Sequence, residues 1–424
     1  RHSAPPAESP AMRLLTALLF LSAPAAAATP DQVARTYADL ALAGYQDSLT
    51  TAQALQQAVA TLIATPSDET LQAARTAWLA ARVPYQQTEA FRFGNPIVDD
   101  WEGRVNAWPL DEGLIDYTSA DYGNEENALA ALNVIATPTF TLSGTAIDAT
   151  TITPALIADT LHEADGIEAN VASGYHAIEF LLWGQDLNGT GPGAGARPFT
   201  DYVRGEGCTG GNCDRRAAYL QAATDLLVAD LGEMTANWAN DGPARAAVTA
   251  EPQSGILAAL TGMGSLSYGE LGGERMKLGL MLNDPEEEHD CFSDNTHNSH
   301  YYDGLGIRNV YLGRYTRVDG SVVEGPSLSD LVAAADPAID AQLKAELDAS
   351  VAALAAIKAT AEAGLAYDQM LAAGDARGES LILAAVDALV TQTASIDRAV
   401  TALGLSKIDF EGSDSLDNPN AIFQ

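Results

Sequence analysis

The sequence has few basic residues: 22 lysines and arginines stand against 57 aspartates and glutamates, for a formal net charge of −35. Such a surface repels the phosphates of nucleic acids and the headgroups of anionic lipids, so we expect no nucleic-acid partner and no docking on acidic membranes. A cation or a basic partner fits the charge better. A saline habitat is the simpler explanation, because acidic surfaces keep proteins soluble in salt.

Cysteine is also scarce, with only three in the chain. Cys208 and Cys213 flank Thr-Gly-Gly-Asn in a glycine-rich stretch, and this spacing can close a small disulfide in an oxidising compartment. Zinc binding by this pair would need further ligands, and none is adjacent. We expect the third cysteine, Cys291, to be buried rather than reactive.

The common catalytic signatures are missing. The sequence contains no Gly-x-Ser-x-Gly elbow, no phosphate-binding P-loop, no dinucleotide fingerprint and no four-cysteine metal cluster. It therefore gives no support to a hydrolase of the nucleophile-elbow type, a nucleotide-dependent enzyme or a zinc ribbon.

The N-terminal segment has the pattern of a secretory signal. From Met12, one arginine, an apolar stretch and an alanine-rich segment follow in the order that export signals use. We assign residues 1–28 to upstream sequence plus signal peptide, and expect an exported protein, periplasmic in location. No later stretch reaches the roughly 18 continuous apolar residues of a membrane span. We therefore expect no membrane-spanning segment after signal removal.

Alanine- and leucine-rich segments with helical spacing dominate the rest and predict an all-α fold of helical bundles with long loops. Extended patterns are few: residues 139–147 predict a small β-hairpin, and residues 321–325 predict a short strand. The predicted helices cover residues 31–63, 68–91, 154–183, 214–238, 254–282, 328–373 and 379–403.

A glycine- and proline-rich stretch at residues 184–216 divides the chain near its middle. We predict an N-terminal bundle over residues 29–205 and a C-terminal bundle over 206–424. Residues 82–117 and 279–318 share a weak pattern, in which a helix is followed by a polar loop and an asparagine–aromatic turn. This pattern suggests that the two halves arose by duplication.

The strongest candidate for chemistry is the pair His176 and Glu179, which stands within an apolar helical run. Residues three apart share one face of a helix, so the two side chains can converge on a metal ion or act as a catalytic pair. They can equally form a hydrogen-bonded pair inside a helical core. Spacing alone leaves these alternatives open, and a metal site would need ligands from elsewhere.

Two further sets of polar residues are candidates for lining a cleft. The acidic, histidine-containing stretch 284–304 includes Asp294 and His297, which follow a predicted helix and are its better site candidates. The N-terminal half contributes another set, for which ordinary packing and ion pairing are equally good explanations. This set consists of Glu89, Arg92, Trp108 and Asp111.

The sequence around the His–Glu pair resembles the signature of the imelysin-like family. "NVASGYHAIEFLLWGQD" at residues 170–186 contains the Gly-x-His-x-x-Glu core at Gly174, His176 and Glu179. "RPFTDY" (197–202), "NAWPLDEGLIDY" (106–117) and "EEEHDCFSDNTHNSHYYDGLGIRNVYLG" (286–313) are most similar to the iron-regulated protein A subgroup. The likeness runs in the same order along nearly the whole chain after residue 28.

The resemblance implies an all-α protein of two bundle-like halves, with the motif helix facing a cleft between them. It implies that His176 and Glu179 bind a metal, iron or zinc, or a small metal chelate. We therefore expect an exported protein of iron acquisition that works with other envelope iron-uptake components. The alternatives are a metallopeptidase of the imelysin type and a non-catalytic module that binds a peptide or ligand.

Overall fold

The computed structural model describes residues 27–120, 122 and 127–423. Within these residues the chain is mainly helical with long loops, and its strands form only two antiparallel hairpins. This confirms the all-α prediction. The predicted signal segment lies almost wholly outside the described residues. The main helices are α1 (Pro30–Ala64), α2 (Asp68–Gln86), α3 (Pro96–Asn106), α4 (Pro154–Leu156), α5 (Gly174–Trp183), α6 (Cys213–Trp238), α7 (Pro243–Thr249), α8 (Pro252–Ser265), α9 (Gly279–Leu282), α10 (Thr296–Leu312), α11 (Leu328–Ala335), α12 (Pro337–Glu362), α13 (Tyr367–Leu371), α14 (Ala376–Ala402) and α15 (Asp414–Asp417).

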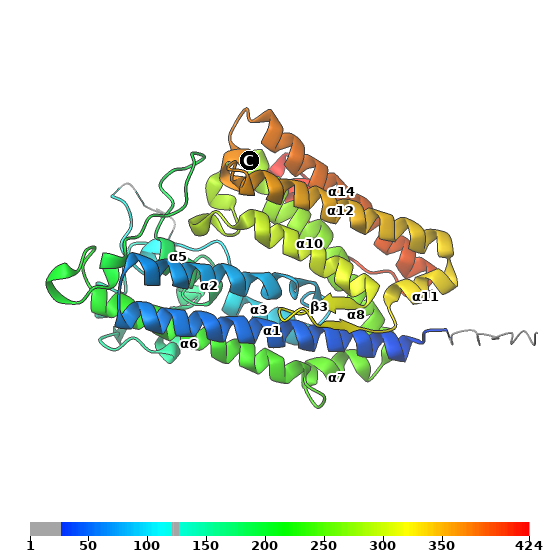
Figure 1. Ribbon diagram of the computed structural model, residues 1–424, viewed down its shortest axis with the longest axis horizontal. Helices are drawn as coiled ribbons and strands as arrows, with labels where there is room; N and C mark the ends of the chain where they lie inside the picture. The colour runs from blue at the N-terminus through cyan, green and yellow to red at the C-terminus, as the bar shows by residue number, and fades with distance from the viewer. Residues whose placement is uncertain (1–26, 121, 123–126, 424) are drawn as a thin grey trace, which may run out of the picture.

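Two groups of helices make up the molecule (Figure 1). In one, the long α1 packs against α2 and α6; in the other, α12 packs against α14 and α10. Helix α10 also packs against α2 and so joins the groups, while α8 contacts both α1 and α14. Helix α6 follows the boundary predicted at residue 205, yet it packs mainly on α1 and α5. The division of the chain into bundles at that residue, and the duplication, stay predictions.

The caps explain where several helices begin. Thr29, Ser67 and Ser327 each accept a hydrogen bond from the third backbone N–H of the helix that follows, and the side chain at that third position bonds back. These capping boxes satisfy N–H groups that have no partner within the helix. Proline stands at the first helical position of α3, α7, α8 and α12. Because it has no N–H, each of these helices starts with one fewer unpaired donor.

The helix predicted over residues 154–183 is broken in the structure. Helix α4 passes into a short π-helix at Ile157–Leu161, and α5 begins only at Gly174. Glu163 and Asp165 adopt left-handed backbone conformations, φ 53° and 60°, which no helix accommodates. The helix predicted over 328–373 is likewise divided, because Pro337 starts α12 anew and Gly364, at φ 103°, separates it from α13.

The predicted extended segments are confirmed. Strands β1 (Thr139–Leu142) and β2 (Thr145–Asp148) form one hairpin, joined at Ser143 and Gly144. Strands β3 (Arg314–Thr316) and β4 (Val322–Glu324) form the other, and this second hairpin packs against α1.

A π-helical segment, η7 (Leu266–Leu278), continues α8 into α9 and packs against α14. By length and composition, α14 alone among the described helices could cross a membrane. Its apolar residues Ile382, Leu389 and Ile396 are fully buried. In the fold, therefore, α14 serves as a core helix.

Candidate functional site

Helix α5 carries the Gly-x-His-x-x-Glu motif, and all ten of its residues are buried. Its first residue, Gly174, has φ +80°, a conformation that side chains strongly disfavour. A β-carbon there would collide with the carbonyl group of Val105 in α3. The glycine of the motif is therefore required by the backbone path into α5 and by its close contact with α3.

Hydrogen bonds with α2, α3 and α6 fix the start of α5. Trp78 of α2 donates from Nε1 to the carbonyl oxygen of Tyr175 at 2.9 Å. Tyr219 of α6 donates to the carbonyl of Ala172 at 2.8 Å, and Ser173 donates to the carbonyl of Arg104 at 2.8 Å. These bonds hold the backbone that carries the motif side chains in one position.

His176 and Glu179 are hydrogen-bonded to each other and have no solvent exposure. His176 Nδ1 lies 3.1 Å from Glu179 Oε2, while Glu179 Oε1 accepts from the backbone N–H and the hydroxyl of Ser293, at 3.0 and 2.6 Å. Both oxygens of Glu179 are therefore engaged. Among the described residues, His176 Nε2 has no hydrogen-bond partner.

Two residues of the turn between Glu288 and η9 (Cys291–Ser293) complete a cluster with His176. The His176 and His289 rings meet edge-on with centroids 4.7 Å apart, and Asp290 Oδ1 lies 3.9 Å from His176 Nδ1. One ligand atom from each of these three buried residues lies within 4.8 Å of the others. Two imidazoles and a carboxylate at such distances can bind a metal ion.

Burial sets the charge states of this cluster. It lowers the pKa of His176 and of His289 well below the usual value, and the positive charge of Arg82 lowers both further. Both imidazoles are therefore neutral and keep a lone pair for a ligand. Burial raises the pKa of Glu179 well above normal, and the neighbouring charge of Asp290 adds to that effect.

Asp290 stays ionised because Arg82 is its partner. Arg82 Nη2 lies 2.7 Å from Asp290 Oδ1, and neither side chain is more than 1% exposed. Burial opposes ionisation, but the charge of Arg82 brings the pKa of Asp290 below its usual value. Asn295 and Ser299 donate to Oδ2, so Oδ1 is the oxygen on the side of His176.

A pocket of about 750 Å³ reaches the cluster at His289. Trp108, whose ring centroid lies 5.2 Å from that of His176, forms part of its wall. Arg92 and Arg275 also line it, but glutamates outnumber them, so the pocket favours cations. The lining glutamates are Glu102, Glu163, Glu168, Glu270, Glu274 and Glu287.

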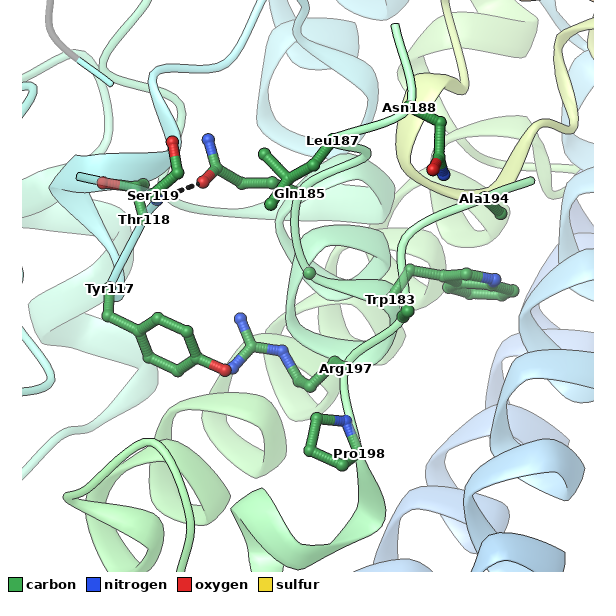
Figure 2. A pocket seen from close by; sticks show the side chains of 12 residues that line it. Tyr117, Thr118, Ser119, Trp183, Gln185, Leu187, Asn188, Ala194, Arg197 and Pro198 are labelled. Atoms are coloured by element: carbon green, nitrogen blue, oxygen red, sulfur yellow. Dashed lines mark hydrogen bonds between the residues drawn. The ribbon is translucent and has the colours of Figure 1, made fainter. Parts of the chain in front are cut away.

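A smaller pocket of about 290 Å³ lies at the C-terminal end of α5 and contains neither motif side chain (Figure 2). Arg197 extends into it beside Tyr117, but its Nη1 is paired with Asp116 and Asp201 at 2.8 and 3.0 Å. Gln185 accepts a hydrogen bond from the backbone of Ser119 on the opposite wall. The charge of this pocket is therefore already neutralised, and the histidine cluster remains the better site.

The structure brings only part of the predicted cleft set together. Arg92 and Trp108 line the larger pocket, and Glu89 lies behind its wall, 2.8 Å from Arg275 Nη2. Asp111 accepts hydrogen bonds from Tyr122 and Asn127 away from this pocket.

Asp294 and His297 also lie away from the larger pocket. Asp294 belongs to a separate group of carboxylates, and His297 Nε2 lies 3.0 Å from Asn298 Nδ2. Cys208 and Cys213 form a disulfide, and Cys291 is buried.

Sequence reasoning passed over His289, Asp290 and Arg82. The first two stand in the acidic stretch 284–304, where we favoured Asp294 and His297 because they follow a helix. A usable signal was present, since Cys291 and Phe292 follow directly and indicate a turn that enters the core. Arg82 sits in an apolar helix without a nearby acidic residue in sequence, so only the fold reveals its partner.

Fold and site together define an all-helical protein with a buried histidine–carboxylate cluster beside an acidic pocket. The family model described as "Imelysin" matches residues 41–396. The chain therefore belongs to the imelysin family, as the motif predicted.

Two of the similar proteins carry the name iron-regulated protein A or its precursor. Iron-regulated protein A of Synechococcus elongatus is 41% identical over 61 residues, a match that spans 14% of this chain and 17% of that protein. Among solved structures, one assigned as an iron-regulated protein A precursor of Parabacteroides distasonis has a TM-score of 0.62 at 20% identity, covering 90% of this chain and 97% of that one. An imelysin-like protein of Psychrobacter arcticum has a TM-score of 0.55 at 15% identity, covering 91% and 100%. At these identities, the two structures show a shared fold.

Proposed function

We propose that this protein binds a metal ion, iron in its working state, through His176, His289 and Asp290. Two observations carry the proposal. The Nε2 atoms of both histidines are buried and without a hydrogen-bond partner among the described residues, and one ligand atom each of His176, His289 and Asp290 lies within 4.8 Å of the others. Leaving a buried polar atom without a partner costs about 1–3 kcal/mol. A bound metal would remove that cost at both rings.

The donor set suits ferrous iron. Two neutral imidazoles and one carboxylate, with other positions left open, are a set that proteins use for iron, and a similar set serves zinc. The open positions would take water or the donor atoms of a small chelate that enters through the acidic pocket. Membership of a family with iron-regulated relatives favours iron.

Glu179 has a different part in this proposal from the one its motif suggests. Its Oε2 holds Nδ1 of His176, which leaves Nε2 as the ring atom for a metal. Ser293 in turn holds Oε1. We therefore place Glu179 behind His176 as the group that orients the ring, and we propose His289 and Asp290 as the missing ligands.

The cellular setting follows from the same proposal. A secretory signal that begins at Met12, within residues 1–28, would place the protein in the periplasm, where it would pass iron or an iron chelate to other envelope components. The strong negative charge of the chain supports the transfer of a cation, because it concentrates cations near the pocket.

Isothermal titration with ferrous iron under anaerobic conditions, and with zinc, tests the proposal. We expect about one ion per chain, and an affinity at least tenfold weaker in His176→Gln and His289→Gln. His162→Gln is the control, since this half-buried histidine lies outside the cluster and interacts with Ser173. Equal binding by all four proteins, or none by the wild type, would refute the site. The second result would favour a sealed structural pair in a non-catalytic binding module.

A metallopeptidase is the second candidate, because the cluster opens on a pocket wide enough for a peptide side chain. Zinc would activate water there, and Glu102 or Glu287 would serve as base. Incubation with unfolded proteins, with and without chelator, tests this reading. Cleavage that stops with chelator and is absent in His289→Gln would support it, and an absence of cleavage in all samples would reject it.

A further inference from the structure

A second group of possible ligands lies apart from the histidine cluster and consists of carboxylates alone. Asp186 follows α5, Asp294 stands between η9 and α10, and Asp368 lies in α13. One oxygen from each lies within 4.8 Å of the other two. Three segments that are far apart in sequence thus bring negative charges to one point.

These charges have no protein counterion. Within the described part of the chain, no lysine, arginine or histidine forms an ion pair with any of the three. Asp368 is only 2% exposed, yet neither of its oxygens has a hydrogen-bond partner, and Asp294 Oδ1 has none either. Asp186 is half-buried, and its Oδ1 accepts hydrogen bonds from the backbone and side-chain amides of Asn188 at 2.9 and 2.8 Å. Gathering like charges around the buried and unpartnered Asp368 is costly, so the arrangement is unfavourable unless a cation joins it.

We propose that Asp186, Asp294 and Asp368 form a calcium site. All the donors are carboxylate oxygens, which favours a hard cation over iron(II) or zinc with their preference for imidazole. Oxygens on opposite sides of a calcium ion are about 4.6–5.2 Å apart, which accommodates the observed spread. Magnesium demands a smaller and more regular shell, and it keeps most of its water.

The site would join three parts of the molecule. Asp186 is three residues past the end of the motif helix, while Asp294 and Asp368 belong to the segments beside α10 and α12. Calcium bound there would hold the end of α5 against the second group of helices. It would raise stability through carboxylates other than the proposed iron ligands, so this inference does not depend on the proposed iron function.

Calorimetric titration of the full chain with CaCl2, after treatment with EGTA, tests the assignment, and thermal unfolding is the second readout. We expect about one calcium per chain and a rise in Tm of several degrees in millimolar CaCl2, with a clearly smaller rise in MgCl2. Asp368→Asn and Asp294→Asn should lose at least tenfold in calcium affinity. Asp387→Asn, an exposed carboxylate of α14, is the matched control and should respond like the wild type.

Folding of the variants is checked in the same experiment. In EGTA, Asp368→Asn should be at least as stable as the wild type, because it removes a buried charge that repels its neighbours. A stable variant without a calcium response would support the site. No calcium binding by the wild type, an equal response to magnesium, or an unchanged response in Asp368→Asn would overturn it. His176→Gln should keep the full calcium response, which separates this result from any failure of the iron site.

Discussion

Arg82 is the residue on which the charge of the candidate site depends. It is 1% exposed, pairs with Asp290 at 2.7 Å and donates to Asn106 Oδ1 at 2.6 Å. Removing one member of a buried ion pair leaves the other charge uncompensated, at a cost of about 3–5 kcal/mol. We predict that Arg82→Met lowers the free energy of unfolding by this amount in urea titrations.

The control for that variant is Arg35→Met. Arg35 pairs with Asp31 at 3.0 Å on the exposed face of α1, where water screens both charges. We expect no measurable change there. If the two variants lose similar stability, the buried pair is not the support that we describe.

Glu102, in the wall of the larger pocket, gives a prediction about pH. Burial raises its pKa to about 7 against the opposing charge of Arg92. In the unfolded chain the group ionises near pH 4.5, so its contribution to stability is fully present below pH 4.5, falls as the pH rises from 4.5 through 7, and levels off above 7. The glutamine of Glu102→Gln does not titrate, so the stability of this variant does not fall with pH for this reason. Relative to the wild type, the variant should therefore gain about 1 kcal/mol of unfolding free energy between pH 6 and pH 8.

Urea titrations at the two pH values, in the presence of chelator, measure this gain. Glu206→Gln, at an exposed position, is the control. A stability difference between Glu102→Gln and the wild type that stays constant from pH 6 to pH 8 would contradict the assignment.

A contact between two side chains can be predicted from the sequence where local geometry alone brings them together. His176 and Glu179 are three apart on a helix, so their contact follows from helix geometry. The contacts of His289 with His176, and of Arg82 with Asp290, join residues more than 100 positions apart. Only the packing of α2 and α5 around the turn at residues 288–293 determines those contacts, which no local pattern encodes.

At the scale of elements, Gly174 determines where the motif helix begins. Its φ of +80° and its contact with Val105 both exclude a β-carbon. We predict that Gly174→Ala lowers the free energy of unfolding by about 2–4 kcal/mol, the sum of backbone strain and overpacking. Metal affinity should fall with it, because α5 must shift.

Gly144 provides a matched control. It also has φ +80°, in the turn of the β1–β2 hairpin, but a β-carbon there meets nothing within 4 Å. Gly144→Ala should therefore lose only the unfolding free energy that backbone strain costs, and its metal affinity should not change. Thermal unfolding and metal titration of both variants provide the comparison, and equal losses would contradict the role of the Val105 contact.

The predicted helices failed where the backbone takes positive φ or where a proline starts a new helix. Capped starts such as Ser67 for α2 and Thr153 for α4 were readable from sequence. The break before α5 was partly readable, because Asp165 and Gly166, both at positive φ, are of residue types that adopt this conformation more readily than others. Glu163 gives no such signal.

At the scale of the whole molecule, the excess of acidic residues should oppose folding by self-repulsion. Salt screens such repulsion over about 10 Å at 0.1 M. We predict that the Tm of the metal-free protein rises as NaCl increases from about 50 to 500 mM at pH 8. The rise should be smaller at pH 5, close to the sequence pI of about 4.2, where the net charge is lower.

Differential scanning calorimetry in chelator at both pH values measures these shifts. Sucrose at matched osmolality controls for general solute effects. A Tm that is independent of salt at pH 8 would show that the acidic surface does not destabilise the fold.

The most direct test of the central claim is anomalous X-ray diffraction from crystals soaked anaerobically in ferrous iron, with data collected on both sides of the iron absorption edge. The proposal predicts one strong anomalous peak in contact with His176 Nε2, His289 and Asp290. Iron at another position only, or no peak beside these histidines while both rings stay as described, would contradict it.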